Sequence, residues 1–155
     1  MRNPSRPNVR ILVVDDYEPF RRFLHLQLQP RTEWQIISEA SDGLEAIHKA
    51  KEHQPDLILL DIELPSLNGI AATHQISKVA PAATILFLSQ NNDAAVIAAA
   101  LSNGANGAKG YVLKQDATEL LAAIESVMRG EHFMSTGVTE RRGDNLPNLD
   151  DLVSC

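Results

Sequence analysis

Four consecutive large aliphatic residues, Leu57 to Leu60, most constrain what this chain can fold into. The run is short, follows Pro55 and precedes the segment Pro65-Ser-Leu-Asn-Gly69. This pattern is typical of a strand buried on both faces in the middle of a parallel sheet. Asp61 directly follows the run. Ligands bind outside the carboxyl ends of strands in open α/β sheets, so Asp61 is a candidate site residue, although a turn aspartate would also fit.

Strand-like and helix-like patterns alternate five times along the chain. Strands are predicted at residues 9–14, 34–37, 57–60, 84–88 and 110–113, each followed by apolar residues at helical spacing. Asp42 with Glu45, and Asp116 with Glu119, resemble capping boxes that open two of the helices. The alternation predicts an α/β fold with a parallel sheet covered by helices on both faces. If the strand order is the flavodoxin-like 2-1-3-4-5, the domain is a doubly wound (βα)5 three-layer sandwich.

The length of 155 residues suits one domain with a full hydrophobic core. We expect residues 1–8 to be a flexible arm, 9–131 the domain, and 132–155 a polar tail or truncated linker. Residues beyond about 135 lack apolar periodicity, so we predict that they make no core contacts. Their removal is expected to leave thermal stability nearly unchanged.

Charge and composition narrow the possible partners. The net charge of -6 favours neither nucleic acid nor acidic membranes, and the sole cysteine, Cys155, excludes an internal disulfide and a cysteine-based zinc site. There is no apolar run of membrane-spanning length and no signal-peptide core. We therefore expect a cytoplasmic protein without membrane contact and without direct, sequence-specific binding of nucleic acid by this chain.

Polar residues lie at the carboxyl ends of four predicted strands: Asp15 and Asp16, Asp61, Ser89 and Lys114. In the order 2-1-3-4-5 the first and third strands are neighbours, so three carboxylates should converge. Their mutual repulsion would raise their pKa values unless a cation lay among them, and oxygen ligands favour a hard divalent ion such as Mg²⁺. With a hydroxyl and an ammonium group added, the set predicts a pocket for a phosphoryl group.

The site residues and their surroundings resemble a known family. The segments that carry the resemblance are Asp15-Asp16, Asp61-Ile-Glu-Leu-Pro-Ser-Leu-Asn-Gly69, Ser89 and Gly110-Tyr-Val-Leu-Lys114. It is the receiver domain of bacterial two-component response regulators, and the resemblance covers about residues 9 to 130. It implies that Asp61 is the phosphoacceptor, and that Mg²⁺ or Mn²⁺ is held by the acidic pair, Asp61 and the Glu63 backbone carbonyl.

The resemblance also implies how the pocket acts. Ser89 would hydrogen-bond the phosphoryl group, Lys114 would pair with it, and Tyr111 would turn inward when Ser89 moves. The donor would be a sensor histidine kinase, a phosphotransfer protein or a small phosphodonor. The surface of the fourth helix, fifth strand and fifth helix would then change to regulate a downstream protein or form a dimer with a second copy. Such a chain is a regulator, not an enzyme that acts on outside substrates.

Two other functions stay open at this point. The first is a receiver-like interaction scaffold that phosphorylation does not control. The segment Gly104-Ala-Asn-Gly-Ala-Lys-Gly110 supports it, because this segment resembles a receiver loop lengthened by three residues. We expect residues 104–110 to be mobile and to weaken coupling to Tyr111 and Lys114. The second is a Mg²⁺-dependent hydrolase, for which the sequence supplies no second general base.

The residues after Glu131, His132 to Ser135, resemble the start of a linker that joins receivers to helix-turn-helix effectors. The effector itself is absent from this sequence. The output target and the cognate kinase therefore do not follow from the sequence.

Overall fold

The computed structural model describes residues 9–102 and 108–142, which form one parallel sheet of six strands in the order β2-β1-β3-β4-β5-β6. The predicted flavodoxin-like order 2-1-3-4-5 is confirmed, and β6 extends it by one strand. The strands are β1 Val9–Val14, β2 Trp34–Ala40, β3 Leu57–Leu60, β4 Thr84–Ser89, β5 Ala108–Leu113 and β6 Phe133–Met134.

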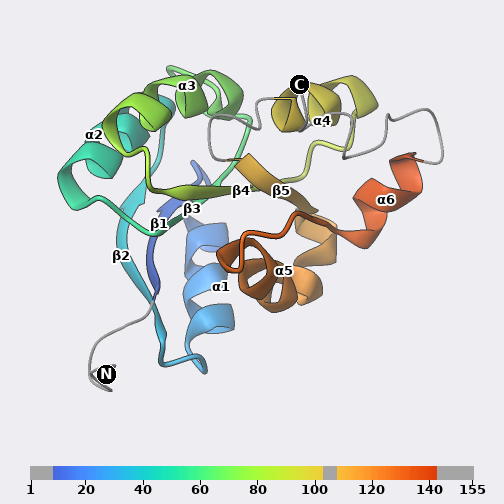
Figure 1. Ribbon diagram of the computed structural model, residues 1–155, viewed down its shortest axis with the longest axis horizontal. Helices are drawn as coiled ribbons and strands as arrows, with labels where there is room; N and C mark the ends of the chain where they lie inside the picture. Colours follow the sequence, from blue (N-terminus) through green and yellow to red (C-terminus); the bar gives the residue numbers. More distant parts are fainter. Residues whose placement is uncertain (1–8, 103–107, 143–155) are drawn as a thin grey trace.

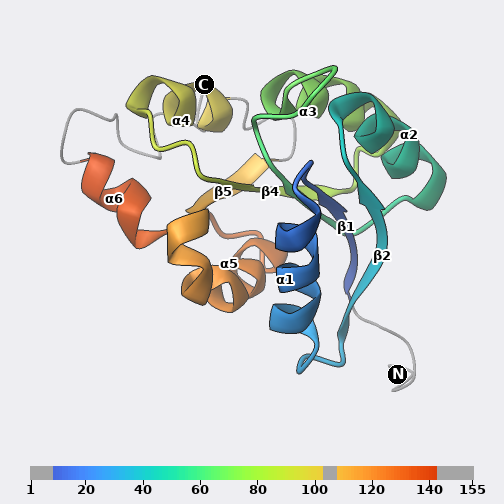
Figure 2. The ribbon, with the colours of Figure 1, turned by 180° about the vertical axis from the view of Figure 1, so that it is seen from behind.

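Helices cover both faces of the sheet, as the alternating pattern predicted. Figure 1 shows α2, α3 and α4 over one face and α1 and α5 over the other, and Figure 2 shows the same layers from behind. A 3-10 helix, η2, joins β5 to α5. The helices are α1 Glu18–Leu28, α2 Gly43–His53, α3 Gly69–Val79, α4 Ala94–Leu101, η2 Lys114–Glu119, α5 Leu120–Met128 and α6 Thr136–Arg142.

Strand β3 contributes side chains to the cores on both faces. Ile58 and Leu60 belong to the cluster under α2, α3 and α4, whereas Leu57 and Leu59 belong to the cluster with α1 and α5. Each of the four is at most 1% exposed. The prediction of a central strand buried on both faces is therefore confirmed.

One of the two predicted capping boxes exists, with a shifted partner. The carboxylate of Asp42 accepts a hydrogen bond from the Glu45 backbone N–H at 2.8 Å and caps α2. The carboxylate of Glu45 accepts from the Ser41 backbone N–H at 2.6 Å, one residue before the expected donor. Orphan N–H groups at a helix start need such acceptors, so α2 begins where the sequence predicted.

The second predicted capping box, Asp116 with Glu119, is wrong. Helix α5 begins at Leu120 without a side-chain cap. The Asp116 carboxylate instead accepts from the Gly137 backbone N–H at 2.7 Å, and Glu119 accepts from the Thr136 N–H at 3.1 Å. Both carboxylates therefore accept hydrogen bonds from the first turn of α6, a helix that the sequence did not predict.

The expectation that residues beyond about 135 make no core contacts is also wrong for the described residues. Val138 of α6 is 0% exposed and belongs to the same cluster as Tyr111 and Leu113. Ser135 donates its backbone N–H to the Tyr111 carbonyl at 3.1 Å, and its hydroxyl oxygen accepts from the Leu113 N–H at 3.0 Å. One buried valine among polar residues shows no periodicity, which is why the sequence pattern missed it.

Three predictions fall on parts of the chain outside the described residues. They concern the arm at 1–8, the glycine-containing segment 104–110, of which residues 104–107 are not described, and the end of the tail at 143–155. The described end of this segment, from Ala108, belongs to β5, which begins two residues earlier than predicted. The division of the chain at residue 131 stays a prediction. Within the described ranges, no helix is long and apolar enough to span a bilayer.

Candidate functional site

The predicted site residues follow the carboxyl ends of neighbouring strands. Asp15 follows β1, Asp61 follows β3 and Lys114 follows β5. Parallel pairing of β1 with β3 and of β3 with β4 brings these ends to one edge of the sheet. A pocket of about 440 Å³ opens there and is lined by Asp16, Tyr17, Asp61, Glu63, Gln90 and Lys114.

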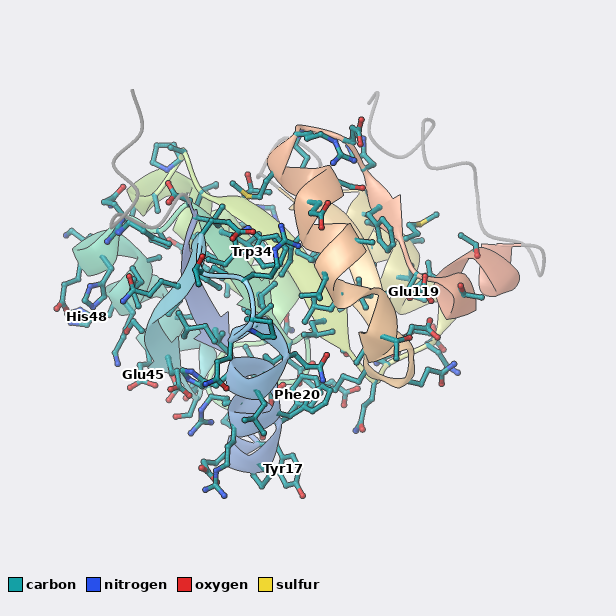
Figure 3. All side chains as sticks on the ribbon, turned by 90° about the horizontal axis from the view of Figure 1, so that it is seen from below. Tyr17, Phe20, Trp34, Glu45, His48 and Glu119 are labelled. Atoms are coloured by element: carbon teal, nitrogen blue, oxygen red, sulfur yellow. The ribbon has the colours of Figure 1, made fainter. Side chains whose placement is uncertain are left out.

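Lys114 joins the two buried carboxylates of the pocket. Its Nζ lies 2.7 Å from Asp15 Oδ2 and 3.1 Å from Asp61 Oδ2. It also lies 4.4 Å from the centre of the Phe20 ring, close enough for a cation–π contact. Figure 3 shows Tyr17 projecting from the N-terminal end of α1 and Phe20 one turn further along. The ammonium is thus held on three sides.

The pKa values of Asp15 and Lys114 reflect both their burial and their pairing. Burial raises the pKa of Asp15 above its ordinary value, although hydrogen bonds from Lys114 and from the Tyr17 backbone N–H oppose that change. Burial by itself would lower the pKa of Lys114, but the hydrogen bond to Asp15 and the charges of Asp61 and Asp15 outweigh it. The pKa of Lys114 is therefore raised, and the ammonium stays charged at neutral pH.

Three carboxylates of the site could hold a metal ion. Oxygen atoms of Asp15, Asp16 and Asp61 all lie within 4.8 Å of one another. When all are ionised, the three carboxylates and the Lys114 ammonium carry a net charge of -2, which one divalent cation neutralises. Oxygen donors at this spacing suit a hard ion such as Mg²⁺. The donor set therefore fits the ion that the resemblance implied.

Glycine at position 69 lets α3 start directly beside Asp61. A Cβ atom on Gly69 would lie 2.1 Å from the Asp61 carbonyl oxygen, which is backbone and has no freedom to rotate away. The Gly69 N–H also donates to the Ile62 carbonyl at 2.7 Å. The Pro-x-x-x-Gly segment thus folds tightly over the end of β3 because its last residue has no side chain.

Ser89 and Tyr111 lie behind the pocket wall. Both are 0% exposed, and neither belongs to the pocket lining. Asn91 connects them: its N–H donates to Ser89 Oγ at 3.1 Å, and its carbonyl accepts from the Tyr111 hydroxyl at 2.6 Å. The Asn91 amide also donates to the Glu63 carboxylate at 2.9 Å. Asn91 therefore links the predicted switch residues to the pocket rim.

Tyr111 is already buried in this structure. Burial raises the pKa of its phenol well above the ordinary value, a hydrogen bond from Ser89 opposes the change, and the nearby charges of Asp61 and Glu63 add to it. The switch role of Tyr111 and the movement that the resemblance implied stay predictions, as do the individual roles of the other site residues.

Some residues of the site were not predicted from the sequence. Tyr17 and Gln90 line the pocket, and the only signal for them was their place directly after strand-end residues. Phe20 packs against the core cluster with α1 and α5, and its ring also faces the Lys114 ammonium. The side chain of Glu63 lines the pocket, whereas a metal-binding role for its carbonyl stays a prediction.

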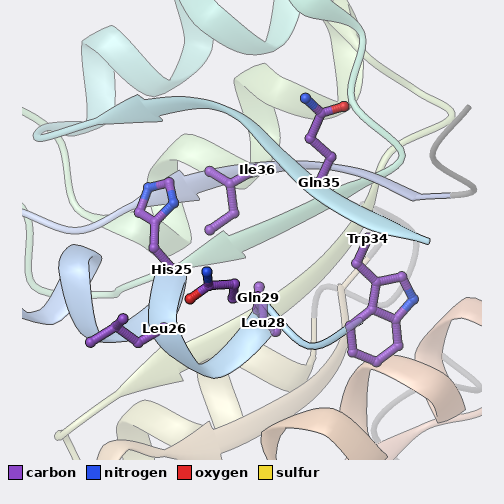
Figure 4. Close-up of a pocket in the computed structure, with 7 residues that line it drawn as sticks. All are labelled: His25, Leu26, Leu28, Gln29, Trp34, Gln35 and Ile36. Atoms are coloured by element: carbon purple, nitrogen blue, oxygen red, sulfur yellow. The ribbon is translucent and has the colours of Figure 1, made fainter. Parts of the chain in front are cut away.

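A second pocket, of about 420 Å³, lies between α1 and β2 and shares no lining residue with the acidic one. Figure 4 shows its residues on the outer strand of the sheet and the facing helix: His25, Leu26, Leu28, Gln29, Trp34, Gln35 and Ile36. It contains no group of carboxylates and no lysine. The group of carboxylates that could hold a metal ion therefore does not lie in this pocket.

Comparison with known proteins agrees with the fold. Residues 11–125 match the response regulator receiver domain family. The transcriptional regulatory protein LnrK of Bacillus subtilis is 38% identical over 123 residues, which are 79% of this chain and 54% of that protein. This chain thus spans about half the length of these curated relatives.

Solved structures give the same result. A LuxR-family two-component response regulator from Aurantimonas sp. SI85-9A1 superposes with a TM-score of 0.81 and 32% identity, covering 88% of this chain and 96% of that one. The response regulator domain of Thermotoga maritima CheB superposes with a TM-score of 0.70 and 35% identity, covering 78% and 96%. With its parallel sheet, its acidic pocket and a family match over three quarters of its length, this chain belongs to the response regulator receiver domain family.

Proposed function

We propose that this chain is a phosphorylation-controlled signalling switch whose phosphoacceptor is Asp61. The observation that carries the proposal is the cluster of Asp15, Asp16 and Asp61 around the Lys114 ammonium at the mouth of one pocket. Membership of the receiver family supports a phosphorylation-activated switch in general. Asp61 is the carboxylate that both lines the pocket and pairs with Lys114.

In the proposed reaction, a carboxylate oxygen of Asp61 attacks the phosphorus of a phosphohistidine or a small acyl phosphate. An O–P bond forms while the donor's N–P or O–P bond breaks, and the donor leaves with that electron pair. Asp61 is oriented for this step, because Oδ1 accepts from the Ile62 N–H at 2.7 Å and Oδ2 from Lys114. A divalent cation held by the carboxylates and the Glu63 carbonyl would offset charge on the transferred group.

Transfer places a phosphoryl group with roughly two negative charges beside Lys114 and Ser89, in place of the single charge of the Asp61 carboxylate. Lys114, now shared with Asp15, would be drawn toward the phosphoryl oxygens, and the Ser89 hydroxyl would donate to one of them. Because Asn91 contacts both Ser89 and the Tyr111 hydroxyl, a shift of Ser89 would reach β5 through two hydrogen bonds. We propose that the output surface is formed by α4, β5 and α5.

Helix α6 adds to this output surface. It packs against β5 and contacts α4. Part of the proposed surface is therefore covered by residues of the same chain. We propose that α6 moves with β5 and is part of the output.

The partners follow from the same chemistry. A histidine kinase, a phosphotransfer protein or a small acyl phosphate would supply the phosphoryl group in the cytoplasm, and a downstream protein or a second copy would read the altered surface. We propose no activity on outside substrates.

Incubation with Mg²⁺ and acetyl phosphate tests the proposal. Mass spectrometry should find one hydroxylamine-labile phosphoryl group, and Asp61→Asn should abolish it. Asp56→Asn is the matched control, because Asp56 precedes the same strand and its carboxylate accepts a hydrogen bond from the Arg10 N–H, which an asparagine side chain also accepts. A phosphoryl group that persists in Asp61→Asn would contradict the assignment.

The scaffold alternative predicts a different result. It expects no phosphoryl uptake by the wild-type chain under any of these conditions. Its main support, the lengthened glycine segment, lies largely outside the described residues, and the intact acidic pocket argues against it.

A further inference from the structure

Arg21 connects the acidic pair to the outer strand of the sheet. From α1, its Nη1 donates to the backbone carbonyl of Asp15 at 2.6 Å, and its Nε donates to Glu39 Oε1 on β2 at 2.9 Å. The side chain is only 17% exposed. A guanidinium that holds two fixed acceptors in this way has little freedom to move.

The carbonyl that Arg21 holds belongs to the peptide between Asp15 and Asp16. The other polar groups of Asp15 are held as well: its N–H by Ala40, and its carboxylate by the Tyr17 N–H and by Lys114. The Asp16 carboxylate, in contrast, is exposed in the pocket and accepts no hydrogen bond from the described residues. Its position therefore depends on the orientation of its backbone, and Arg21 fixes one side of that backbone.

Glu39 makes this arrangement compatible with a cation nearby. An unpaired guanidinium beside three carboxylates would compete with a divalent ion for their charge. Glu39 pairs with Arg21, its second oxygen lies 3.0 Å from His25 Nε2, and its backbone carbonyl accepts from Lys49 at 2.9 Å. Burial would raise the pKa of Glu39, but hydrogen bonds from His25 and Arg21 outweigh it and lower the pKa. The carboxylate is therefore ionised at neutral pH.

We infer that Arg21 is a positioning residue: it orients the Asp15–Asp16 peptide so that Asp16 presents its carboxylate to a cation, while Glu39 orients and neutralises the guanidinium. The inference rests on the proposed function, because it takes the three carboxylates as the cation site. Arg21 itself contacts neither the cation nor the phosphoryl group. It acts through the backbone of residues that would.

The test measures Mg²⁺ affinity of the full chain by titration calorimetry. Arg21→Ala should bind Mg²⁺ about 10-fold more weakly than wild type, the usual effect of losing a group that orients a metal ligand. Arg21→Lys should fall between the two, because an ammonium keeps the charge but cannot reach both acceptors in a fixed fork. Glu39→Gln should also weaken binding, because the charge of Arg21 is then unbalanced.

Arg31→Ala is the matched control for lost stability. Arg31 pairs with Glu33 and Glu125 and lies over the Trp34 ring. None of these three residues lines the acidic pocket. Removing the Arg31 side chain should lower the melting temperature yet leave Mg²⁺ affinity unchanged. Equal losses of Mg²⁺ affinity in the Arg21 and Arg31 variants would show a general effect of stability and overturn the inference.

A second readout needs no metal. In nuclear magnetic resonance relaxation without Mg²⁺, the Asp16 and Tyr17 amides of Arg21→Ala should be less ordered than in wild type. If both Arg21 variants keep the Mg²⁺ affinity and the amide order of the wild type, the inference is overturned. Phosphoryl uptake by the wild-type chain would still uphold the proposed function in that case. Failure of the wild-type chain to bind Mg²⁺ would instead refute the metal part of that function, and the order of these amides would still decide the role of Arg21.

Discussion

Truncating Val138 to alanine tests whether α6 is part of the folded domain. Val138 is 0% exposed and packs in the cluster that contains Tyr111 and Leu113. Removing two buried methyl groups costs about 0.8 kcal/mol each, and the cavity left behind adds to that cost. We expect the free energy of unfolding to fall by about 2 kcal/mol and the melting temperature by roughly 6 °C.

Thermal unfolding followed by circular dichroism measures this change. Thr139→Ala is the matched control, because Thr139 is exposed one residue further along α6 and its hydroxyl only donates to the Thr136 carbonyl. Its effect should stay within about 0.5 kcal/mol. Removing residues 132–155 should cost more than Val138→Ala, since it also removes the Ser135 hydroxyl from the buried Leu113 N–H. A melting temperature unchanged by Val138→Ala would show that α6 does not dock.

Three further predictions concern the site. Lys114→Gln leaves two buried carboxylates facing each other. The melting temperature should therefore fall more at neutral pH than in mild acid, where one of the two carboxylates is protonated. An equal fall at the two pH values would contradict this. The raised pKa of Tyr111 means that the folded state keeps its proton while the unfolded state loses it, so stability should decline as pH rises above about 10. In a Tyr17→Phe variant, which leaves Tyr111 as the only tyrosine, absorbance should show ionisation only together with unfolding. Gly69→Ala should slow phosphoryl uptake on Asp61, because the new Cβ displaces the Asp61 carbonyl; an unchanged rate of uptake would refute this.

The helix-cap residues show where prediction from sequence succeeds and where it fails. Asp42 caps the helix that follows it directly, so a local pattern was enough to place the start of α2. Asp116 and Glu119 have the same spacing, but their carboxylates bind the first turn of α6, about twenty residues further along the chain. A capping pattern states that an acceptor is available, and only the folded chain decides which helix supplies the donors.

The site divides in the same way. The strand-end positions of Asp15, Asp61 and Lys114 follow from the sequence, because a parallel sheet brings the carboxyl ends of its strands to one edge. The contacts of Phe20 with Lys114 and of Arg21 with the Asp15 carbonyl do not. They depend on how α1 is rotated against the sheet, and both residues fit an ordinary amphipathic helix in the sequence.

The sequence by itself determined the alternation of strands and helices and the polar residues at the strand ends, because hydrophobic periodicity is a local property. The tertiary structure alone decided that β6 extends the sheet, that Val138 closes the core beside β5, and that Ser89 and Tyr111 lie behind the pocket wall. These features arise from contacts between segments distant in the sequence. Their energy comes from burial and from hydrogen bonds that only the assembled sheet makes possible.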